Sequence, residues 1–322
     1  MILKCANLHI MTFKIENKTM IRIVSKYEIL SKKLLLIISV FSLYSCKNPD
    51  RETNHSINAD GIENILDHEG YKLVWHDEFD YSGNPDPKKW TYENGFVRNM
   101  ELQWYQTENA YVRDGLLLIE GRKDTFPNPG YNNLGNSWQE KREYVHYTSS
   151  SVTTKGLHSW HYGVFEIKAK ISCQNGLWPA IWTLGEGHEW PTGGEIDIME
   201  YYGGNILANA AWASNNRWEA LWDDLRKPID SFGDLEWCEN FHIWRMEWTS
   251  NEIKIYLDDF LMNSIELDKT NNQRGEIKNP FRGTNQFIIL NLAIGGTAGG
   301  NPSEVIFPTR FEIDYVRIYQ KF

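Results

Sequence analysis

Six consecutive residues, Glu195-Ile196-Asp197-Ile198-Met199-Glu200, place three carboxyl groups on one short segment. Acids this close cannot all ionise at their ordinary pKa values, because each charge opposes the next. Two carboxyl groups that face one bond suit glycoside hydrolysis, in which one attacks the anomeric carbon and the other protonates the departing oxygen. The spacing predicts Glu195 and Glu200 as that pair, with Asp197 bonded to the nucleophile and helping to distribute the protons.

The positions of these acids also predict the shape of the strand that carries them. Side chains alternate between the faces of a strand, so Glu195 and Asp197 share one face and Glu200 should point to the other. A β-bulge at Ile198-Met199 would return Glu200 to the first face, and bulges are common beside active sites. Retaining enzymes hold the two carboxyl groups about 5–5.5 Å apart, which requires a strongly curved, bulged sheet.

An exposed acidic strand is the alternative interpretation, because runs of charge usually form solvated faces. The residues before the acids argue against it. Residues 176–185 and 190–194 contain Trp178, Trp182 and Trp190 among several glycines. Tryptophan combines a large apolar face with an N–H donor, so tryptophans beside carboxyl groups favour a sugar-binding cleft.

Several segments together resemble glycoside hydrolase family 16, most closely its bacterial laminarinase-like branch. The matching segments are residues 73–80, 99–105, 162–170, 176–200, 290–296 and 313–319. The resemblance implies a β-jelly-roll sandwich of two antiparallel sheets with a concave substrate groove. It also implies a retaining double displacement with Glu195 as nucleophile, Asp197 as its assistant and Glu200 as acid/base, without a cofactor for catalysis.

The resemblance further suggests which residues bind the sugar. It places Trp178 and Trp182 in the groove around the glycone side, although both could be core tryptophans. It assigns contacts with the next sugars to Asn99, Glu101 and Trp104. Three further candidates are weaker expectations, because some of the fourteen tryptophans must lie in the core: Trp190, Trp212 and Trp222.

Many members of the family bind a structural calcium ion on the convex side. The matching positions are Glu78 and Gly115, through backbone oxygens, and Asp314, through its carboxylate. Oxygen ligands of this kind suit calcium. Asp314 could equally be an ordinary acid of an edge strand.

Length and composition independently favour an all-β fold. The chain has 322 residues, of which 41% are hydrophobic, enough for one large core. Runs such as residues 111–119 and 287–290 are apolar and lie between turn residues, which is typical of strands. Helical periodicity is weak outside the first third of the chain.

The N-terminal region has the features of an export signal. Lys32-Lys33 precede the apolar run 34–41, and Ser45-Cys46 resembles a bacterial lipoprotein cleavage site. We therefore expect a signal peptide over residues 1–45, with Met20 as an alternative start. A lipid on Cys46, a flexible tether over 46–65 and a catalytic domain over 66–322 would follow. The apolar run is shorter than a membrane span requires, so contact with the cell envelope would be through the lipid alone.

Charge and cysteine content limit the partners. The formal net charge of −10 argues against nucleic acid and favours a neutral glycan over a strongly sulfated one. A monomer is expected. Cys173 and Cys238 could form a disulfide in an exported protein or remain as two buried thiols.

Four functions fit these residues. The first is an endo-β-glucanase that cuts β-1,3 or mixed β-1,3/1,4 glucan. The second uses the same mechanism on an algal galactan, for which Arg217 and Arg226 are the nearest basic residues to the groove. The third is a non-catalytic glycan-binding lipoprotein, and the fourth is a transglycosylase. Residues 205–214 depart from the family pattern, which leaves the linkage open.

Overall fold

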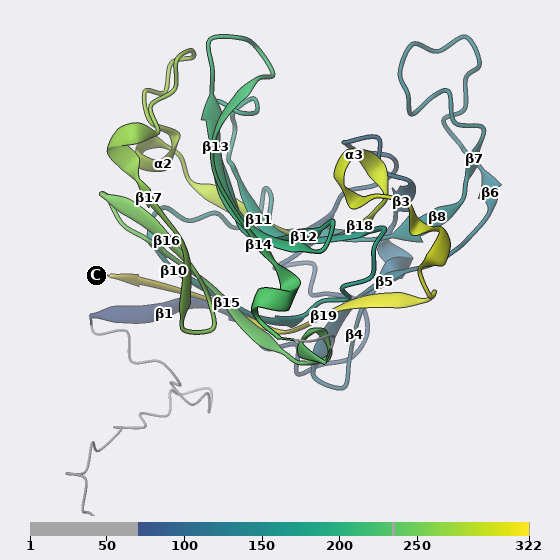
Figure 1. The fold of residues 1–322 in the computed structure, drawn as a ribbon, viewed down its shortest axis with the longest axis horizontal. Helices are drawn as coiled ribbons and strands as arrows, with labels where there is room; N and C mark the ends of the chain where they lie inside the picture. The colour runs from purple at the N-terminus through teal and green to yellow at the C-terminus, as the bar shows by residue number, and fades with distance from the viewer. Residues whose placement is uncertain (1–69, 234–235, 322) are drawn as a thin grey trace, which may run out of the picture. The chain divides into compact units, whose positions relative to one another are not determined.

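Two antiparallel β-sheets stacked on one another form the body of the structure, a computed structural model that describes residues 70–233 and 236–321 (Figure 1). One sheet has the strand order β17-β16-β15-β10-β19-β5-β4, with β1 also paired to β19. The other has the order β14-β13-β12-β11-β18-β9-β2. Each sheet combines hairpins of consecutive strands, such as β14-β13-β12-β11, with pairs that are far apart in sequence, such as β10 with β19 and β11 with β18. The all-β prediction is confirmed.

The eight-stranded sheet consists of β1 (Tyr71–Asp77), β4 (Ala110–Arg113), β5 (Leu116–Gly121), β10 (Gly163–Lys170), β15 (His242–Trp248), β16 (Glu252–Leu257), β17 (Phe260–Glu266) and β19 (Thr309–Lys321). The seven-stranded sheet consists of β2 (Thr91–Tyr92), β9 (Ser151–Thr153), β11 (Leu177–Gly185), β12 (Glu195–Tyr202), β13 (Asn205–Ala213), β14 (Ala220–Pro228) and β18 (Gln286–Ile294).

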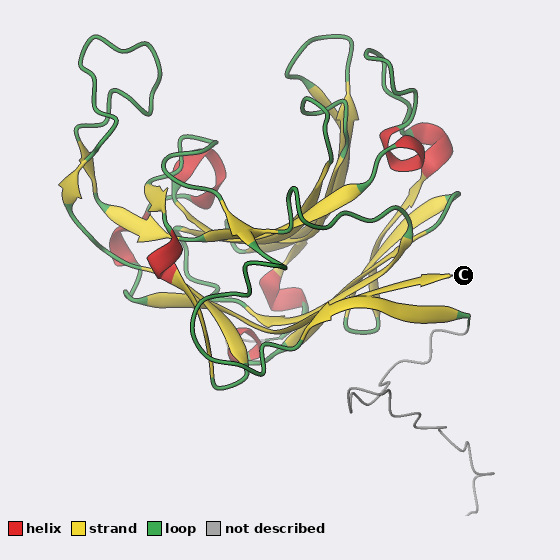
Figure 2. Cartoon of the chain, turned by 180° about the vertical axis from the view of Figure 1, so that it is seen from behind, coloured by secondary structure: helices red, strands yellow, loops and turns green. Residues whose placement is uncertain are grey.

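Shorter elements connect these strands. Two small sheets pair β3 (Gln103–Tyr105) with β8 (Tyr147–Ser149) and β6 (Phe126–Pro127) with β7 (Tyr144–Val145). The helical turns are α2 (Pro280–Gly283), α3 (Gly296–Gly299), η1 (Thr107–Asn109), η2 (Ile229–Ser231), η3 (Trp237–Glu239), η4 (Leu267–Lys269) and η5 (Pro302–Glu304). Figure 2 shows that these helical turns are short segments within the loops that connect the strands. Among the described residues, no helix is long and apolar enough to cross a membrane.

Alternating side chains fill the space between the sheets. Trp244, Met246 and Trp248 of β15 are buried, and the residues between them are partly exposed. They belong to one cluster with Ile196 and Ile198 of β12, from the other sheet. Apolar residues at every second position therefore form the shared core, and the outer faces are left for other functions.

Two sequence expectations take a more specific form in the structure. The apolar run 111–119 is a hairpin, in which β4 and β5 flank a turn at Asp114 and Gly115. The run 287–290 lies within β18, which is buried along its whole length.

Cys173 and Cys238 form a disulfide between the segment after β10 and the turn η3. This settles the alternative that composition left open.

All described residues belong to one compact unit, Asp67–Phe322. The expected signal peptide, the lipid site at Cys46 and the whole of the expected tether lie outside the described residues. Those expectations stay predictions.

Candidate active site

The predicted bulge lies in the middle of β12. On one side, Asp197 pairs with Asn209 and Glu200 with Leu207, so Ile198 and Met199 together oppose one residue of β13. On the other side, the register with β11 also shifts within this segment. Ile198 and Met199 are buried in the core. The extra residue returns Glu200 to the face of Glu195, and the prediction of a bulge is confirmed.

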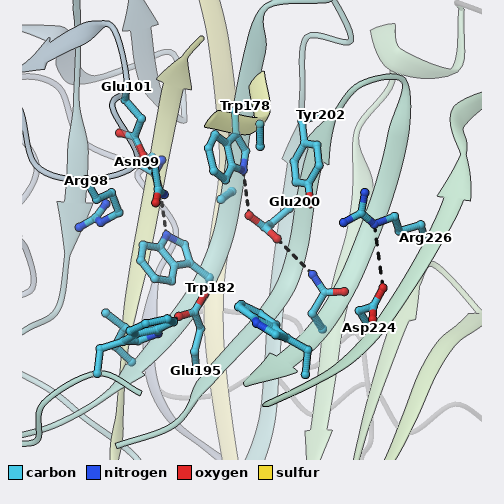
Figure 3. A pocket seen from close by; sticks show the side chains of 17 residues that line it. Arg98, Asn99, Glu101, Trp178, Trp182, Glu195, Glu200, Tyr202, Asp224 and Arg226 are labelled. Atoms are coloured by element: carbon cyan, nitrogen blue, oxygen red, sulfur yellow. Dashed lines mark hydrogen bonds and ion pairs between the residues drawn. The ribbon is translucent and has the colours of Figure 1, made fainter. Parts of the chain in front are cut away.

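Both glutamates face a cleft of about 630 Å³ on the outer, concave face of the seven-stranded sheet. Figure 3 shows the cleft crossing the strands, with Arg98, Asn99 and Glu101 at one end and Asp224 and Arg226 at the other. Glu195 and Glu200 stand on opposite sides between these ends. A chain of sugars that follows the cleft would therefore pass between the two carboxyl groups.

Each glutamate is held by the indole N–H of a different tryptophan. Trp178 Nε1 donates to Glu200 Oε1 at 2.8 Å. Trp190 Nε1 donates to Glu195 Oε2 in a short hydrogen bond. These donors fix where the carboxyl groups point while leaving the tryptophan faces available to a sugar.

The loop before β12 is built to bring Trp190 and Glu195 together. Gly194 has φ +79°, and a Cβ at this position would lie 2.8 Å from Phe281 and 2.9 Å from Pro280. Gly185 and Gly193 approach so closely that a Cβ on Gly185 would lie 2.1 Å from the Gly193 carbonyl oxygen. The glycines that precede the acids therefore allow a tight return of the chain into the catalytic strand.

Asp197 lies beneath the two glutamates and is 1% exposed. Burial, with the charges of Glu200 and Glu195, raises its pKa well above the ordinary value for aspartate. Asp197 is hydrogen-bonded to both Glu195 and Glu200, and because it keeps its proton it can donate to an ionised glutamate. This arrangement favours ionised Glu195, as the role of a nucleophile requires.

The glutamates are themselves shifted. Burial, followed by the charge of Glu200, raises the pKa of Glu195 to about 7. Burial also raises the pKa of Glu200, against the hydrogen bonds that favour its ionised form. The three acids therefore share fewer charges near neutral pH than three isolated carboxyl groups would, and they titrate as a unit.

Six of the predicted sugar-binding residues line the cleft. They are Asn99, Glu101, Trp178, Trp182, Trp190 and Trp222. Trp182 donates through Nε1 to Asn291 Oδ1 at 2.7 Å and is only 8% exposed, so it forms part of the cleft floor. Trp222 is 44% exposed and stands on the edge strand β14.

Two predicted residues lie elsewhere, and these assignments are corrected. Trp212 is 7% exposed and belongs to the core cluster between the sheets, because it alternates on β13 with residues that face the cleft. Trp104 packs edge-to-face on Phe96 and Phe126. Neither lines the cleft.

Sequence patterns did not identify several residues that line the cleft. These are Arg98, Ala180, Leu184, Tyr202, Asn209, Asp224, Asn291 and Ala298. Period two on β12 and β14 could have found Tyr202 and Asp224, which follow Glu200 and Trp222 by two positions. Arg98 could not be found in this way, because a loop carries it across the ring of Trp182 with its charge paired to Glu93.

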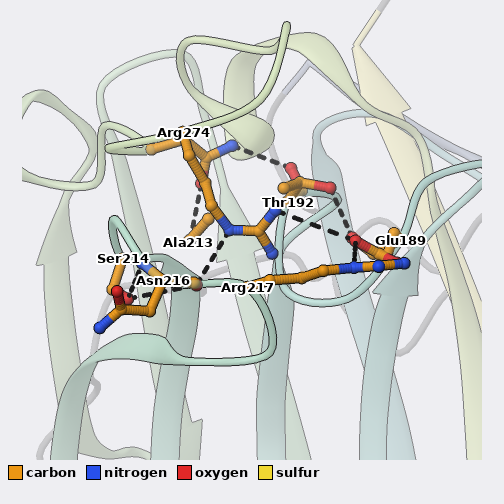
Figure 4. A network of polar contacts seen from close by, with 8 residues as sticks. Glu189, Thr192, Ala213, Ser214, Asn216, Arg217 and Arg274 are labelled. Atoms are coloured by element: carbon orange, nitrogen blue, oxygen red, sulfur yellow. Dashed lines mark hydrogen bonds and ion pairs between the residues drawn. The ribbon is translucent and has the colours of Figure 1, made fainter.

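The basic residues named for the galactan alternative differ in position. Arg226 lines the cleft, 4.0 Å from Asp224 and over the ring of Tyr202. Arg217 lies outside it and pairs with Glu189. Figure 4 shows this pair within a network that joins Arg274, Asn216 and Thr192.

The residues proposed for calcium are engaged with cations. Asp314 Oδ2 lies 2.6 Å from Lys168 Nζ, and both oxygens of Glu78 accept from Arg317. Among residues 70–233 and 236–321, no group of three or more His, Cys, Asp or Glu side chains is arranged to hold a metal ion. A calcium ion on the Asp314 carboxylate would have to displace the lysine. The backbone oxygens of Glu78 and Gly115 are not engaged by these ion pairs, and calcium at the three residues stays a prediction.

Comparison with known proteins agrees with the geometry. Residues 89–317 match the profile of glycosyl hydrolases family 16. A β-glucanase of Rhodothermus marinus is 36% identical over 267 residues, 78% of this chain and 85% of the relative. A keratan-sulfate endo-1,4-β-galactosidase of Sphingobacterium multivorum is 27% identical, over 89% of this chain and 66% of the relative.

Solved structures give the same result. A chain from work on endo-acting O-glycanases with which human gut bacteria initiate mucin breakdown is 34% identical, with a TM-score of 0.71, over 79% of this chain and 92% of that one. The laminarinase catalytic domain of Thermotoga maritima is 33% identical, with a TM-score of 0.65, over 79% of this chain and all of that one. The extent of these matches and the acids on β12 show that the chain belongs to glycoside hydrolase family 16 and is a glycoside hydrolase.

Proposed function

We propose that the protein is a retaining endo-β-glucanase that hydrolyses β-1,3 or mixed β-1,3/1,4 glucan. The observation that carries this proposal is the bulge in β12, which sets Glu195 and Glu200 on one face of a cleft that crosses the sheet. A cleft of this form accepts the interior of a chain, which favours endo cleavage. The β-glucanase and laminarinase relatives support glucan as the substrate.

The reaction proceeds in two displacements. In the first, a Glu195 carboxylate oxygen forms a bond to the anomeric carbon as the bond from that carbon to the leaving oxygen breaks. Glu200 gives its proton to the leaving oxygen. In the second, Glu200 takes a proton from water, whose oxygen attacks the anomeric carbon and releases Glu195. Each displacement inverts the carbon, so the product keeps the configuration of the substrate.

The cleft residues around the acids support binding of a neutral sugar chain. Trp178, Trp190 and Trp222 supply aromatic surface near the scissile bond. The two arginines that line the cleft are each accompanied by an acid, Arg98 by Glu93 and Arg226 by Asp224. The net charge along the cleft is therefore not strongly positive, as a heavily sulfated glycan would require.

A screen of the purified protein against laminarin, lichenan, agarose and porphyran, with sizing of the products, tests the proposal. We expect laminarin or lichenan to yield a ladder of oligosaccharides, and proton NMR to show the β-anomer first. Digestion of agarose or porphyran alone would contradict the glucan assignment. Inversion at the anomeric carbon would contradict the mechanism.

A second candidate substrate is a galactose-containing glycan. The O-glycanase chain has a higher TM-score than the laminarinase, and the keratan-sulfate endo-galactosidase matches a longer part of this chain. Arg98 and Arg226 also give the cleft hydrogen-bond donors at both ends (Figure 3). Mucin O-glycans and keratan sulfate belong in the same screen, and cleavage of either without cleavage of laminarin would establish this candidate.

Hydrolysis and transglycosylation share every residue named above, since they differ only in whether water or a sugar reaches the glycosyl-enzyme. Product sizing distinguishes them, because transglycosylation yields chains longer than the starting oligosaccharide. We propose hydrolysis. A non-catalytic binding role has no support, because all three acids are present and oriented toward one another.

We also propose, from sequence alone, that Cys46 carries a lipid that anchors the enzyme to the cell envelope as a monomer. A Cys46→Ser variant should then leave the membrane fraction and appear in soluble form. Structural calcium at Glu78, Gly115 and Asp314 stays a prediction that the ion pair of Asp314 with Lys168 disfavours. An unchanged melting temperature after chelation would agree with that ion pair.

A further inference from the structure

Asn209 connects two of the three acids. This residue lies on β13 directly opposite Asp197 and is 4% exposed. Its Nδ2 group donates to Asp197 Oδ2 at 3.2 Å and to Glu200 Oε2 at 3.2 Å. Both hydrogens of the amide are thereby used on carboxyl oxygens.

The orientation of the Asn209 amide is set from the other side. Its Oδ1 accepts the backbone N–H of Leu225 on β14 at 3.2 Å. A reversed amide would place Nδ2 against that N–H donor and Oδ1 against two carboxyl groups, which would be unfavourable at both ends. The edge strand therefore fixes which atoms of Asn209 face the acids.

This orientation fixes the Asp197 carboxyl group. Asp197 Oδ2 accepts from Asn209. The same carboxyl group is hydrogen-bonded to both glutamates, Glu195 and Glu200. Glu200 accepts from Trp178 on one oxygen and from Asn209 on the other, which holds its carboxyl group in a single orientation.

We propose that Asn209 is a positioning residue, which fixes the Asp197 carboxyl group beneath the two glutamates and holds Glu200 in place to protonate the leaving oxygen. The proposal rests on the two-step mechanism above and holds for a glucan or a galactoside alike. It explains why an amide stands in a segment, 205–214, that otherwise departs from the family pattern. A carboxyl group here would add a fourth acid, and an apolar side chain would remove a hydrogen-bond donor from both Asp197 and Glu200.

Asn209→Leu tests the proposal, with Asn291→Leu as the matched control. Leucine keeps the shape of asparagine and removes every hydrogen bond. Asn291 is also 4% exposed and lines the same cleft, but it bonds to Trp182 and Tyr105 in place of the acids. The readouts are the melting temperature, the dependence of kcat/KM on pH, and the rate on an aryl glycoside with an activated leaving group.

We expect Asn209→Leu to lower kcat on polysaccharide by about 10–100-fold, in the range of a hydrogen bond to a charged group. The alkaline limb of its pH profile should move upward, because ionised Glu200 loses a donor. The activated glycoside should lose much less rate, since its leaving group needs no proton. Asn291→Leu should alter KM and stability but leave both limbs of the profile in place.

A wild-type pH profile in Asn209→Leu, or equal losses on polysaccharide and activated glycoside, would overturn the proposal. The profile is measured on whichever polysaccharide the wild type cleaves. If the wild type does not cleave laminarin, the glucan assignment is contradicted, but the proposal for Asn209 is not affected. Only the comparison of Asn209→Leu with the wild type and with Asn291→Leu tests the role of Asn209.

A second observation concerns Trp218, in the turn between β13 and β14. Its backbone has φ +64°, a conformation that bulky side chains rarely adopt, and the residue is 57% exposed. The Arg217 guanidinium lies 5.0 Å from the centre of its ring, and Arg217 makes three hydrogen bonds to Glu189. Arg274 Nε donates to the backbone oxygen of Asn216 at 3.0 Å (Figure 4). The turn thus holds a strained, exposed tryptophan in one place.

This turn stands above one side of the cleft. It joins the strands that carry Asn209 and Trp222, and it is tied to Glu189, the neighbour of Trp190 (Figure 1). We infer that Trp218 is a further sugar-stacking residue, which binds a unit of the glycan chain that extends beyond Trp222. The inference also rests on the proposed function, because only an extended chain would reach both tryptophans.

Binding to the Glu195→Ala variant, measured by calorimetry with polysaccharide and with a trisaccharide, tests this inference. We expect Trp218→Ala to weaken polysaccharide binding about 3–10-fold, the range of an aromatic contact, and to leave the trisaccharide unchanged. Phe260→Ala is the control, because Phe260 is 49% exposed on the other sheet. Equal effects on both ligands, or none on polysaccharide, would refute the role. If the wild type cleaves galactan only, the same comparison is made with galactan.

Discussion

Two groups of carboxyl groups, one on each sheet, are held in opposite ways. On the eight-stranded sheet and beside it, acids lie against cations: Lys168 pairs with Asp314, Lys170 with Glu312 and Arg317 with Glu78. On the concave sheet, the acids of β12 are bonded to indole N–H groups, to an amide and to one another. Those three structural acids are therefore neutralised by cations, whereas the acids of β12 are held by neutral donors and by one another. The division is not complete, because Asp224 of the concave sheet pairs with Arg226, and burial raises the pKa of Glu166 on the eight-stranded sheet.

The pKa values follow this difference. Burial of Glu78 opposes its ionisation, but hydrogen bonds from His76 and Arg317 outweigh burial and lower its pKa to about 2. Glu195 has no comparable cation, and burial raises its pKa to about 7. Glu195, which must react near neutral pH, is thus kept away from strong cationic partners. Glu78, which supports the fold, is in direct contact with one.

The largest expected effect of this division is on turnover. Glu195→Ala and Glu200→Ala should each lower kcat at least about 10³-fold, because each removes a group that reacts directly with substrate or proton. Binding of the glycan should survive, since the tryptophans remain. Glu78→Gln is the matched control and should retain kcat within about 2-fold, measured on the glycan that the wild type cleaves. Appreciable hydrolysis by the Glu195 variant would refute its assignment as nucleophile.

A smaller effect, of opposite sign on the two sheets, is expected in stability. The ordinary pKa of both glutamates is 4.5. Because folding raises the pKa of Glu195, its contribution to stability is present below pH 4.5 and is lost as the pH rises through about 7. Because folding lowers the pKa of Glu78, its contribution is present above pH 4.5 and is lost as the pH falls toward 2.

Melting curves from pH 3 to 8 measure this difference. Glu195→Gln should raise the melting temperature by a few °C at pH 8, with the gain vanishing near pH 4. Glu78→Gln should lower it at pH 8, with the loss shrinking toward the acid end. About 1 kcal/mol shifts the melting temperature by roughly 2–4 °C in a domain of this size. Parallel curves for the two variants would contradict the contrast between the sheets.

The sequence was most informative where a local rule was broken. Strict alternation would have turned Glu200 into the core, and that conflict predicted the bulge that the structure contains. Resemblance to the family supplied the fold and the cleft positions of Trp178 and Trp182. These features depend on short segments, whose residues and spacing can be read directly.

Features that depend on pairing between distant strands were not predictable. Asn209 meets Asp197 only because β13 pairs with β12 in one register. Trp212 was misassigned because tryptophan suits a core as well as a cleft, and its face is decided by that register. Arg98 and Trp182 come together from separate parts of the chain. No local pattern in the sequence specifies such contacts.

The smallest expected effect on activity concerns the disulfide, which lies between elements that adjoin β10 and β15 of the eight-stranded sheet. A Cys173→Ser/Cys238→Ser variant should lose about 2–4 kcal/mol of unfolding free energy, because the bond closes a long loop between residues 65 positions apart. Turnover at 25 °C should stay within about 2-fold. Chemical denaturation and initial rates measure the two quantities.

One hydrogen bond connects the region of the disulfide with the catalytic strand and allows a further test. The Tyr201 hydroxyl, on the catalytic strand, donates to the Cys173 backbone oxygen at 2.6 Å. If the disulfide acts on stability alone, Tyr201→Phe and the double serine variant should both keep the wild-type kcat. If kcat falls in both variants, the disulfide positions the catalytic strand β12 through Tyr201. The elements that support the structural carboxyl groups would then also affect catalysis.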